Sequence, residues 1–199
     1  MLEIFHKGGP LMYPILFCSV LALGIFFERL WLFFRVRRGT LVLLRDVEGL
    51  VHKQHIDEAV LVCQRSGTPL ARIFVAALRS CGRPREQIKT IVEEVGGREM
   101  APLERYLGLL GTIATIAPLL GLLGTVLGMI QAFNVIASQG VGTPATLGGG
   151  ISQALITTAA GLSVAIPVIL LHKYLSSKAD RLILEMEEYS LHIVDLLGR

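Results

Sequence analysis

The stretch that decides the fold covers residues 106–172 and reads YLGLLGTIATIAPLLGLLGTVLGMIQAFNVIASQGVGTPATLGGGISQALITTAAGLSVAIPVILLH. It contains no Asp, Glu, Lys or Arg. A hydrocarbon core of ~30 Å needs only about 20 helical residues, so this run is too long for one crossing. Its middle, residues 138–150, is rich in Gly, Thr and Pro, which is typical of a turn. We therefore predict two membrane helices joined by a loop.

Small residues give these two helices a face that a plain lipid anchor lacks. An anchor is apolar all round, whereas glycine lets two helix backbones approach closely in lipid. Two prolines also fall inside the helices, and each removes one backbone donor and predicts a kink. The predicted packing glycines are Gly121, Gly124, Gly128 and Gly161, and the predicted kinks lie at Pro118 and Pro167.

Hydroxyl side chains are the second unusual feature of the two helices. Any one of them can bond to a carbonyl of its own helix, and that explanation is as good as a functional one. For the whole set, a face that lines a polar path or a helix interface is the better explanation. The residues are Thr112, Thr115, Thr125, Thr157, Thr158 and Ser163.

Composition places the chain among integral membrane proteins. It has 199 residues, of which 52% are hydrophobic, and a mean hydropathy of +0.61. The glycine runs lack the ending of a P-loop, no nucleophile elbow is present, and the five histidines have no metal-ligand spacing. Basic residues are mixed with acidic ones, which argues against a nucleic-acid face. We expect no enzyme activity, no cofactor, no metal and no nucleic-acid partner.

A third apolar run, residues 10–34, predicts a first span, so we expect an all-α integral membrane protein with three transmembrane helices and long cytoplasmic helical extensions. The charges that flank these spans predict the topology. Residues 35–105 hold 13 Lys and Arg and the tail after residue 172 holds 4, whereas the loop 138–150 holds none. The positive-inside rule then places the N-terminus outside the cell membrane and the C-terminus in the cytoplasm. The predicted segments are a periplasmic arm (1–9), a first span (10–34), a cytoplasmic helical segment (35–105), a second span (106–137), a periplasmic loop (138–150), a third span (151–175) and a cytoplasmic helix (176–199).

Two features of the cytoplasmic side allow alternatives. Glu28 and Arg29 are either a local pair near the membrane surface, or else an inter-subunit contact or a charge in a gate region. The apolar stripe that continues from Leu175 towards Leu197 is either packed on its own chain or part of an oligomeric bundle. Between the first two spans, Thr68 and Pro69 read as an N-cap and first residue of a helix.

Several of these residues resemble a known family. Residues 118–126 (PLLGLLGTV), residues 150–162 (GISQALITTAAGL) and the following Ala-Ile-Pro resemble the signatures of the MotA/TolQ/ExbB proton-channel family, ExbB/TolQ branch. The resemblance implies a ring, expected as a pentamer, around a dimer of a single-span partner of the ExbD/TolR type. It also implies a bacterial inner-membrane location, and a TonB- or TolA-type protein that the complex drives.

The resemblance assigns the pore threonines to Thr125 and Thr158. One departure is Gln153, a candidate pore-proximal residue, which stands where many family members have Glu and which cannot titrate. Threonine cannot titrate near neutral pH either, so a proton path needs a carboxylate from another chain, expected as an intramembrane Asp on the partner. We expect a motor subunit driven by the proton-motive force that energises TonB-dependent outer-membrane transport. The alternatives are a TolQ-like role in outer-membrane maintenance and a non-conducting membrane scaffold.

Overall fold

The computed structural model of the protein describes residues 5, 7–139 and 144–198. These residues form helices and turns without a strand, which confirms the predicted all-α class. Three helical runs are long and apolar enough to cross a membrane: α2, the run that includes α5 and α6, and α7. The helices are α2 (Met12–His52), α3 (Ile56–Ser66), α4 (Pro69–Arg79), α5 (Arg85–Glu104), α6 (Leu107–Gln139) and α7 (Pro144–Leu197).

The helices extend beyond the spans expected from hydropathy. α2 continues without a break from the first span into the charged segment, and α6 and α7 reach into the loop expected at 138–150. Only residues 140–143 separate α6 from α7, and they lie outside the described residues. Pro144 fits the first position of a helix, where its missing N–H is not needed. The loop is therefore shorter than the composition predicted.

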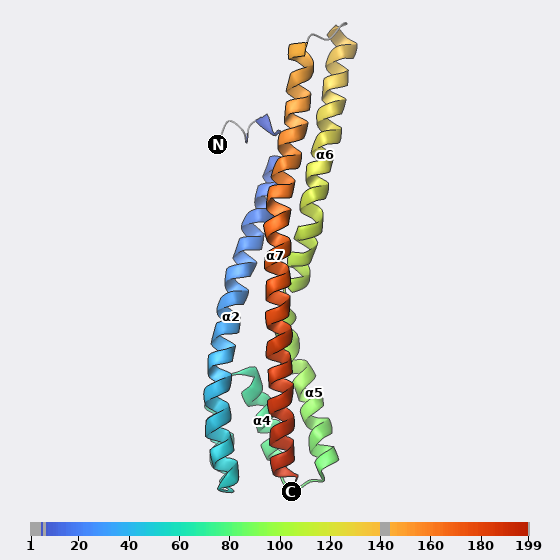
Figure 1. The fold of residues 1–199 in the computed structure, drawn as a ribbon. Helices are drawn as coiled ribbons and strands as arrows, with labels where there is room; N and C mark the ends of the chain where they lie inside the picture. The colour runs from blue at the N-terminus through green and yellow to red at the C-terminus, as the bar shows by residue number, and fades with distance from the viewer. Residues whose placement is uncertain (1–4, 6, 140–143, 199) are drawn as a thin grey trace. The chain divides into compact units, whose positions relative to one another are not determined.

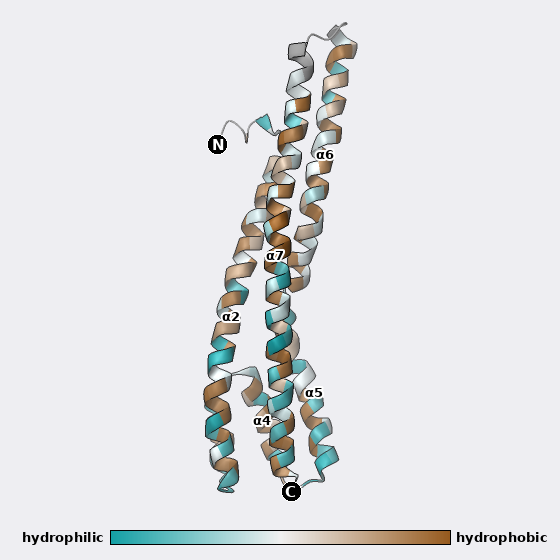
Figure 2. Cartoon of the chain, viewed as in Figure 1, coloured by the Kyte–Doolittle hydropathy of each residue, from teal (hydrophilic) through white to brown (hydrophobic). Residues whose placement is uncertain are grey.

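The chain forms two compact units, and the first comprises residues 1–27 and 106–174. In this unit α6 and α7 run antiparallel and side by side (Figure 1). Their buried positions carry mainly small side chains, whereas their exposed positions carry large apolar ones. This inverted pattern suits a bilayer, where lipid solvates the exposed apolar groups. Figure 2 shows that hydrophilic residues are more frequent in α5 and in the C-terminal part of α7 than in α6. The exposed residues of α6 and α7 include Leu119, Leu122, Val126, Ile130, Phe133, Leu155, Ile166 and Leu170.

The second unit comprises residues 28–105 and 175–199 and has a conventional core. α4 supplies its most buried side chains, with Leu70, Ile73 and Phe74 fully enclosed. The apolar stripe of α7 is buried from Leu175 to Leu197 against the same chain. Of the two alternatives for that stripe, the structure supports packing on its own chain.

Local signals read from the sequence account for the start of α4. Thr68 caps the helix by accepting a hydrogen bond from the backbone N–H of Ala71 at 3.2 Å, and Pro69 is the first helical residue, as predicted. Gly67 ends α3 with a φ of +61°, a left-handed conformation that glycine adopts without strain.

A break separates α5 from α6. α5 ends at Glu104 and α6 begins at Leu107. Tyr106 has a φ of +67°, which is uncommon for a residue with a side chain. Pro102 lies in the last turn of α5, and its carbonyl accepts the N–H of Arg105 at 3.3 Å in a tightened turn.

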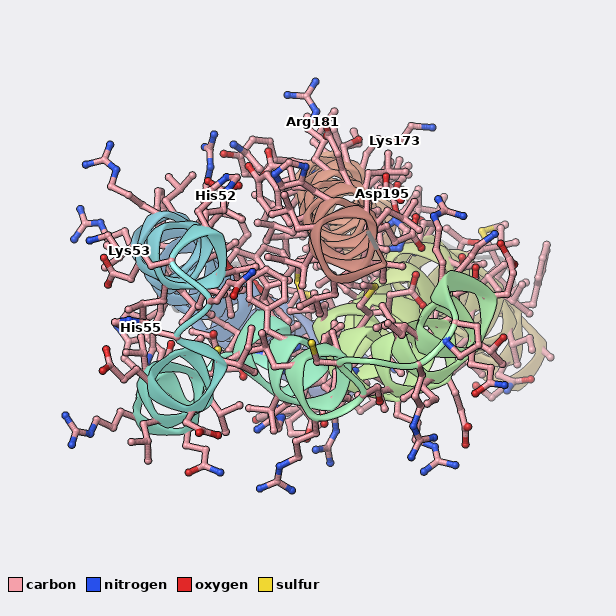
Figure 3. The ribbon with its side chains drawn as sticks, turned by 90° about the horizontal axis from the view of Figure 1, so that it is seen from below. His52, Lys53, His55, Lys173, Arg181 and Asp195 are labelled. Carbon is pink, nitrogen blue, oxygen red and sulfur yellow. The ribbon has the colours of Figure 1, made fainter. Side chains whose placement is uncertain are left out.

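Ion pairs join the helix ends in this second unit. Arg85 at the start of α5 pairs with Asp195 near the end of α7 at 2.7 Å, and this carboxylate raises the pKa of the exposed guanidinium. His192 on α7 pairs with Glu48 on α2 at 3.1 Å. His52 lies at the end of α2, and Asp195 and Arg181 lie on α7 (Figure 3).

Candidate ion pathway

Backbone contact between α6 and α7 forms the centre of the candidate site. A Cβ added to Gly161 would lie 2.6 Å from the carbonyl oxygen of Ala117, and one added to Gly121 would lie 3.1 Å from the Cα of Thr158. Further along, a Cβ on Gly128 would lie 2.8 Å from the carbonyl oxygen of Gly150. We call this line of contacts the glycine seam; it comprises Gly121, Gly124 and Gly128 of α6 and Gly150, Thr157 and Gly161 of α7. All four predicted packing glycines lie in it.

Thr157 is the buried hydroxyl of the seam. It has no exposed surface, and its side chain fills the space in front of Gly124. Its Oγ1 lies 2.7 Å from the carbonyl oxygen of Gln153 in its own helix and 2.9 Å from that of Gly8 in the N-terminal arm. A single hydroxyl proton serves both acceptors, so Thr157 connects α7 to the arm.

Thr158, one of the two expected pore threonines, bonds across the seam. Its hydroxyl donates to the carbonyl oxygen of Gly121 at 3.1 Å, and the side chain is half-buried. This carbonyl belongs to the other helix, so the bond differs from those of the remaining hydroxyls. Thr158 thereby lies where the two backbones are in contact.

Thr125, the second expected pore threonine, is bonded within its own helix. Its hydroxyl donates to the carbonyl oxygen of Leu122 at 2.6 Å. Thr112 and Thr115 donate in the same way to carbonyls four residues earlier. For these three hydroxyls the geometry matches the local explanation that the sequence left open.

The other predicted site residues take up separate positions. Gln153 lies against the N-terminal arm, because a Cβ on Gly9 would collide with its side-chain amide. Both prolines are accommodated inside continuous helices, Pro118 in α6 and Pro167 in α7.

Arg29 and Glu28 belong to the other unit, where they form a local pair. The buried Arg29 guanidinium donates to both Glu28 carboxylate oxygens, at 2.6 and 2.9 Å, and to the carbonyl oxygen of Pro102 at 2.9 Å. The pair therefore connects α2 to the last turn of α5. This geometry matches the local alternative for Glu28 and Arg29.

His172 also lies in this region, and metal-ligand spacing in the sequence did not identify it. It lies at the end of the charge-free stretch and packs against Gly111, since a Cβ there would lie 3.1 Å from its Nε2. A sequence signal for it exists, because it falls inside the predicted span 151–175 and an ionisable residue in a span points to function. The described residues contain no cluster of His, Cys, Asp and Glu that could hold a metal.

Comparison with known proteins settles the family. The profile of the MotA/TolQ/ExbB proton channel family matches residues 65–188. That match includes the last part of α3, α4 to α6 and most of α7. The chain belongs to this family.

Individual members of the family match over most of the chain. A biopolymer transport protein of Synechocystis, ExbB-like 1, is 38% identical over 185 residues, which cover 89% of this chain and 71% of that protein. An ExbB homolog of Methanothermobacter thermautotrophicus is 32% identical over 90% of this chain and 64% of that protein. The Tol-Pal system protein TolQ of Pseudomonas aeruginosa is 33% identical over 64% of this chain and 62% of that protein.

As a MotA/TolQ/ExbB family protein of the ExbB/TolQ branch, the chain is a multi-pass membrane protein with three apolar helices. The family match includes the glycine seam and the threonines beside it.

Proposed function

We propose that the chain is the ring-forming subunit of a motor driven by the proton-motive force. The observation that carries this proposal is the glycine seam with Thr158 bonded across it, in a family of proton channels. A seam of backbone contacts gives each subunit a stiff helical hairpin, and several hairpins side by side can enclose a path. Homologues named ExbB and TolQ support the same assignment.

The proton-carrying carboxylate comes from a second protein. Residues 106–172 contain no Asp or Glu, and a hydroxyl can orient water or a carboxylate without itself titrating. A single-span partner of the ExbD/TolR type with an intramembrane Asp supplies this group, and Thr125 and Thr158 receive the carboxylate or its water. Gln153 cannot carry the proton by its own titration, and its side chain lies against the N-terminal arm.

The complex lies in the inner membrane with the N-terminus in the periplasm and the C-terminus in the cytoplasm. The distribution of Lys and Arg supports this orientation. As a pentamer around two partner helices, it drives a TonB-type protein and so energises outer-membrane transport. A TolQ-like role is the alternative that the similarity to the Pseudomonas protein supports.

Two measurements test the proposal. The native mass of the complex, after co-expression with a single-span partner encoded nearby, should correspond to a ring of this chain that holds two partner copies. When a proton gradient is imposed on proteoliposomes of that complex, protons should flow down it and bring the internal pH towards the external pH. A complex that assembles but passes no protons would identify a scaffold instead.

The variant Thr158→Val tests the role of the seam hydroxyl. We expect it to abolish most of the proton flux while the native mass stays the same, because valine keeps the shape and removes the hydroxyl. Thr112→Val is the matched control, since Thr112 is exposed and bonds only the Gly108 carbonyl of its own helix. Equal flux in both variants would refute a conducting role for Thr158.

A further inference from the structure

One end of the contact between α6 and α7 differs from the rest. At Gly121, Gly128 and Gly161 an added Cβ would meet backbone atoms of the facing helix, and at Gly124 it would meet the Thr157 side chain. At Gly111 the nearest atoms to an added Cβ belong to an imidazole: Nε2 of His172 at 3.1 Å and Cδ2 and Cε1 at 3.5 Å. The missing side chain of Gly111 thus makes room for the His172 ring.

His172 is also the first titratable side chain after Tyr106 in the sequence. Residues 107–171 contain no Asp, Glu, Lys, Arg, His, Cys or Tyr. Histidine is the side chain that gains and loses a proton most readily near neutral pH. A proton that travels along α6 and α7 therefore meets no titratable side chain of this chain before it reaches His172.

The charged groups around the imidazole are few. Within the described part of residues 1–27 and 106–174, the charged side chains are Lys7 and Lys173. Lys173 is exposed and points away from the helices (Figure 3). Lys7 adjoins Gly8, which contacts Thr157, about 22 Å along α7 from His172 at 1.5 Å per residue.

Other titratable groups of this unit do not pair with the ring. Tyr106 and Tyr174 make interactions of their own, and Tyr13 and Cys18 lie on α2. Among the described residues the His172 imidazole has no hydrogen-bond or ion-pair partner, unlike His55 and His192. The ring is half-buried beside Gly111, and its exposed part can reach water.

We propose that His172 is the proton-accepting group at its end of the path. One ring nitrogen takes a proton from a hydronium ion arriving along α6 and α7, which leaves water and an imidazolium. The imidazolium then gives a proton to water on the side of Lys173 and returns to the neutral ring. The step moves one proton and needs no other reactant; it rests on the proposed function, which supplies the proton flux.

The experiment measures proton flux in proteoliposomes of the complex with its single-span partner, as a function of pH on the His172 side. Wild-type flux should show an inflection as this pH is varied. His172→Gln should lower the flux about 100-fold, the lower part of the range for a positioned proton-transfer group, and remove the inflection. His52→Gln, at the exposed end of α2, is the control that should keep both (Figure 3).

Chemical rescue separates proton transfer from a packing role. His172→Ala should be inactive alone and recover flux when imidazole is added, because the free base replaces the missing ring in the space beside Gly111. Wild-type flux and an unchanged inflection in His172→Gln would overturn the inference, as would an inactive His172→Ala that imidazole does not restore. Absence of flux in wild type would instead refute the proposed motor function.

Discussion

Replacement of Gly161 by alanine is the sharpest test of the glycine seam. The new Cβ would lie 2.6 Å from the carbonyl oxygen of Ala117 and 3.0 Å from the Cα of Gly121. To bring the first of these contacts to even 3.0 Å, the two helices must separate by 0.4 Å, the difference between the two distances. No side-chain rotation can relieve the contact, because both obstacles are backbone atoms.

The expected magnitude is the balance of two terms. Overpacking a well-fitted contact costs about 1–3 kcal/mol. Alanine in a helix interior gains about 0.5–1 kcal/mol over glycine. Gly161→Ala should therefore destabilise the protein by roughly 0–2.5 kcal/mol.

Gly108→Ala is the matched control on α6. Nothing lies within 4 Å of a Cβ at this exposed position, so only the favourable helix term applies. The assay is reversible unfolding in mixed micelles with increasing SDS, followed by circular dichroism. If Gly161→Ala were as stable as Gly108→Ala, the backbone contact inferred between α6 and α7 would be refuted.

Three further predictions concern single side chains. Thr157→Val should cost about 1 kcal/mol by leaving the Gly8 carbonyl without its donor, and faster proteolysis of the N-terminal arm should report it, whereas unchanged cleavage would contradict the contact. Burial raises the pKa of the Cys63 thiol to about 12, so this thiol stays in its unreactive neutral form through pH 10. A maleimide should therefore label the exposed Cys81 in native protein and Cys63 only after SDS is added. Rapid labelling of Cys63 in native protein would disprove its burial. Arg29→Lys keeps the charge but loses the forked contact to carboxylate, so it should destabilise the protein by about 1 kcal/mol in the same SDS titration, and wild-type stability would show that the fork contributes nothing.

Much of the fold follows from patterns that are local in the sequence. The charge-free run predicts two membrane helices, and the Thr68-Pro69 pair predicts the start of α4, because hydropathy and capping act over a few residues. The break at Tyr106 was not predictable in this way. Tyrosine and arginine are both acceptable in a helix, and the left-handed backbone of Tyr106 has no signal of its own.

The types of residue at the candidate site were predictable from the sequence, but which residues face each other across the two helices was not. Glycine and threonine at membrane depth indicate close helix contact, but which glycine faces which residue depends on the register of two distant helices. The neighbours Thr157 and Thr158 show the difficulty: they lie about 100° apart on the helix, so one reaches the N-terminal arm and the other reaches Gly121. The sequence alone does not fix that rotation.

The glycine seam also bears on how the protein is synthesised. α6 leaves the ribosome with its grooved face uncovered, and the helix that fills this groove is α7, a further 54 residues of chain. At roughly 5–20 residues per second, the synthesis of these 54 residues takes about 3–11 s. During that interval lipid tails occupy the groove, and membrane proteases and chaperones encounter an unpaired helix. We expect variants that slow translation between α6 and α7 to lower the yield of this protein without altering the folded product.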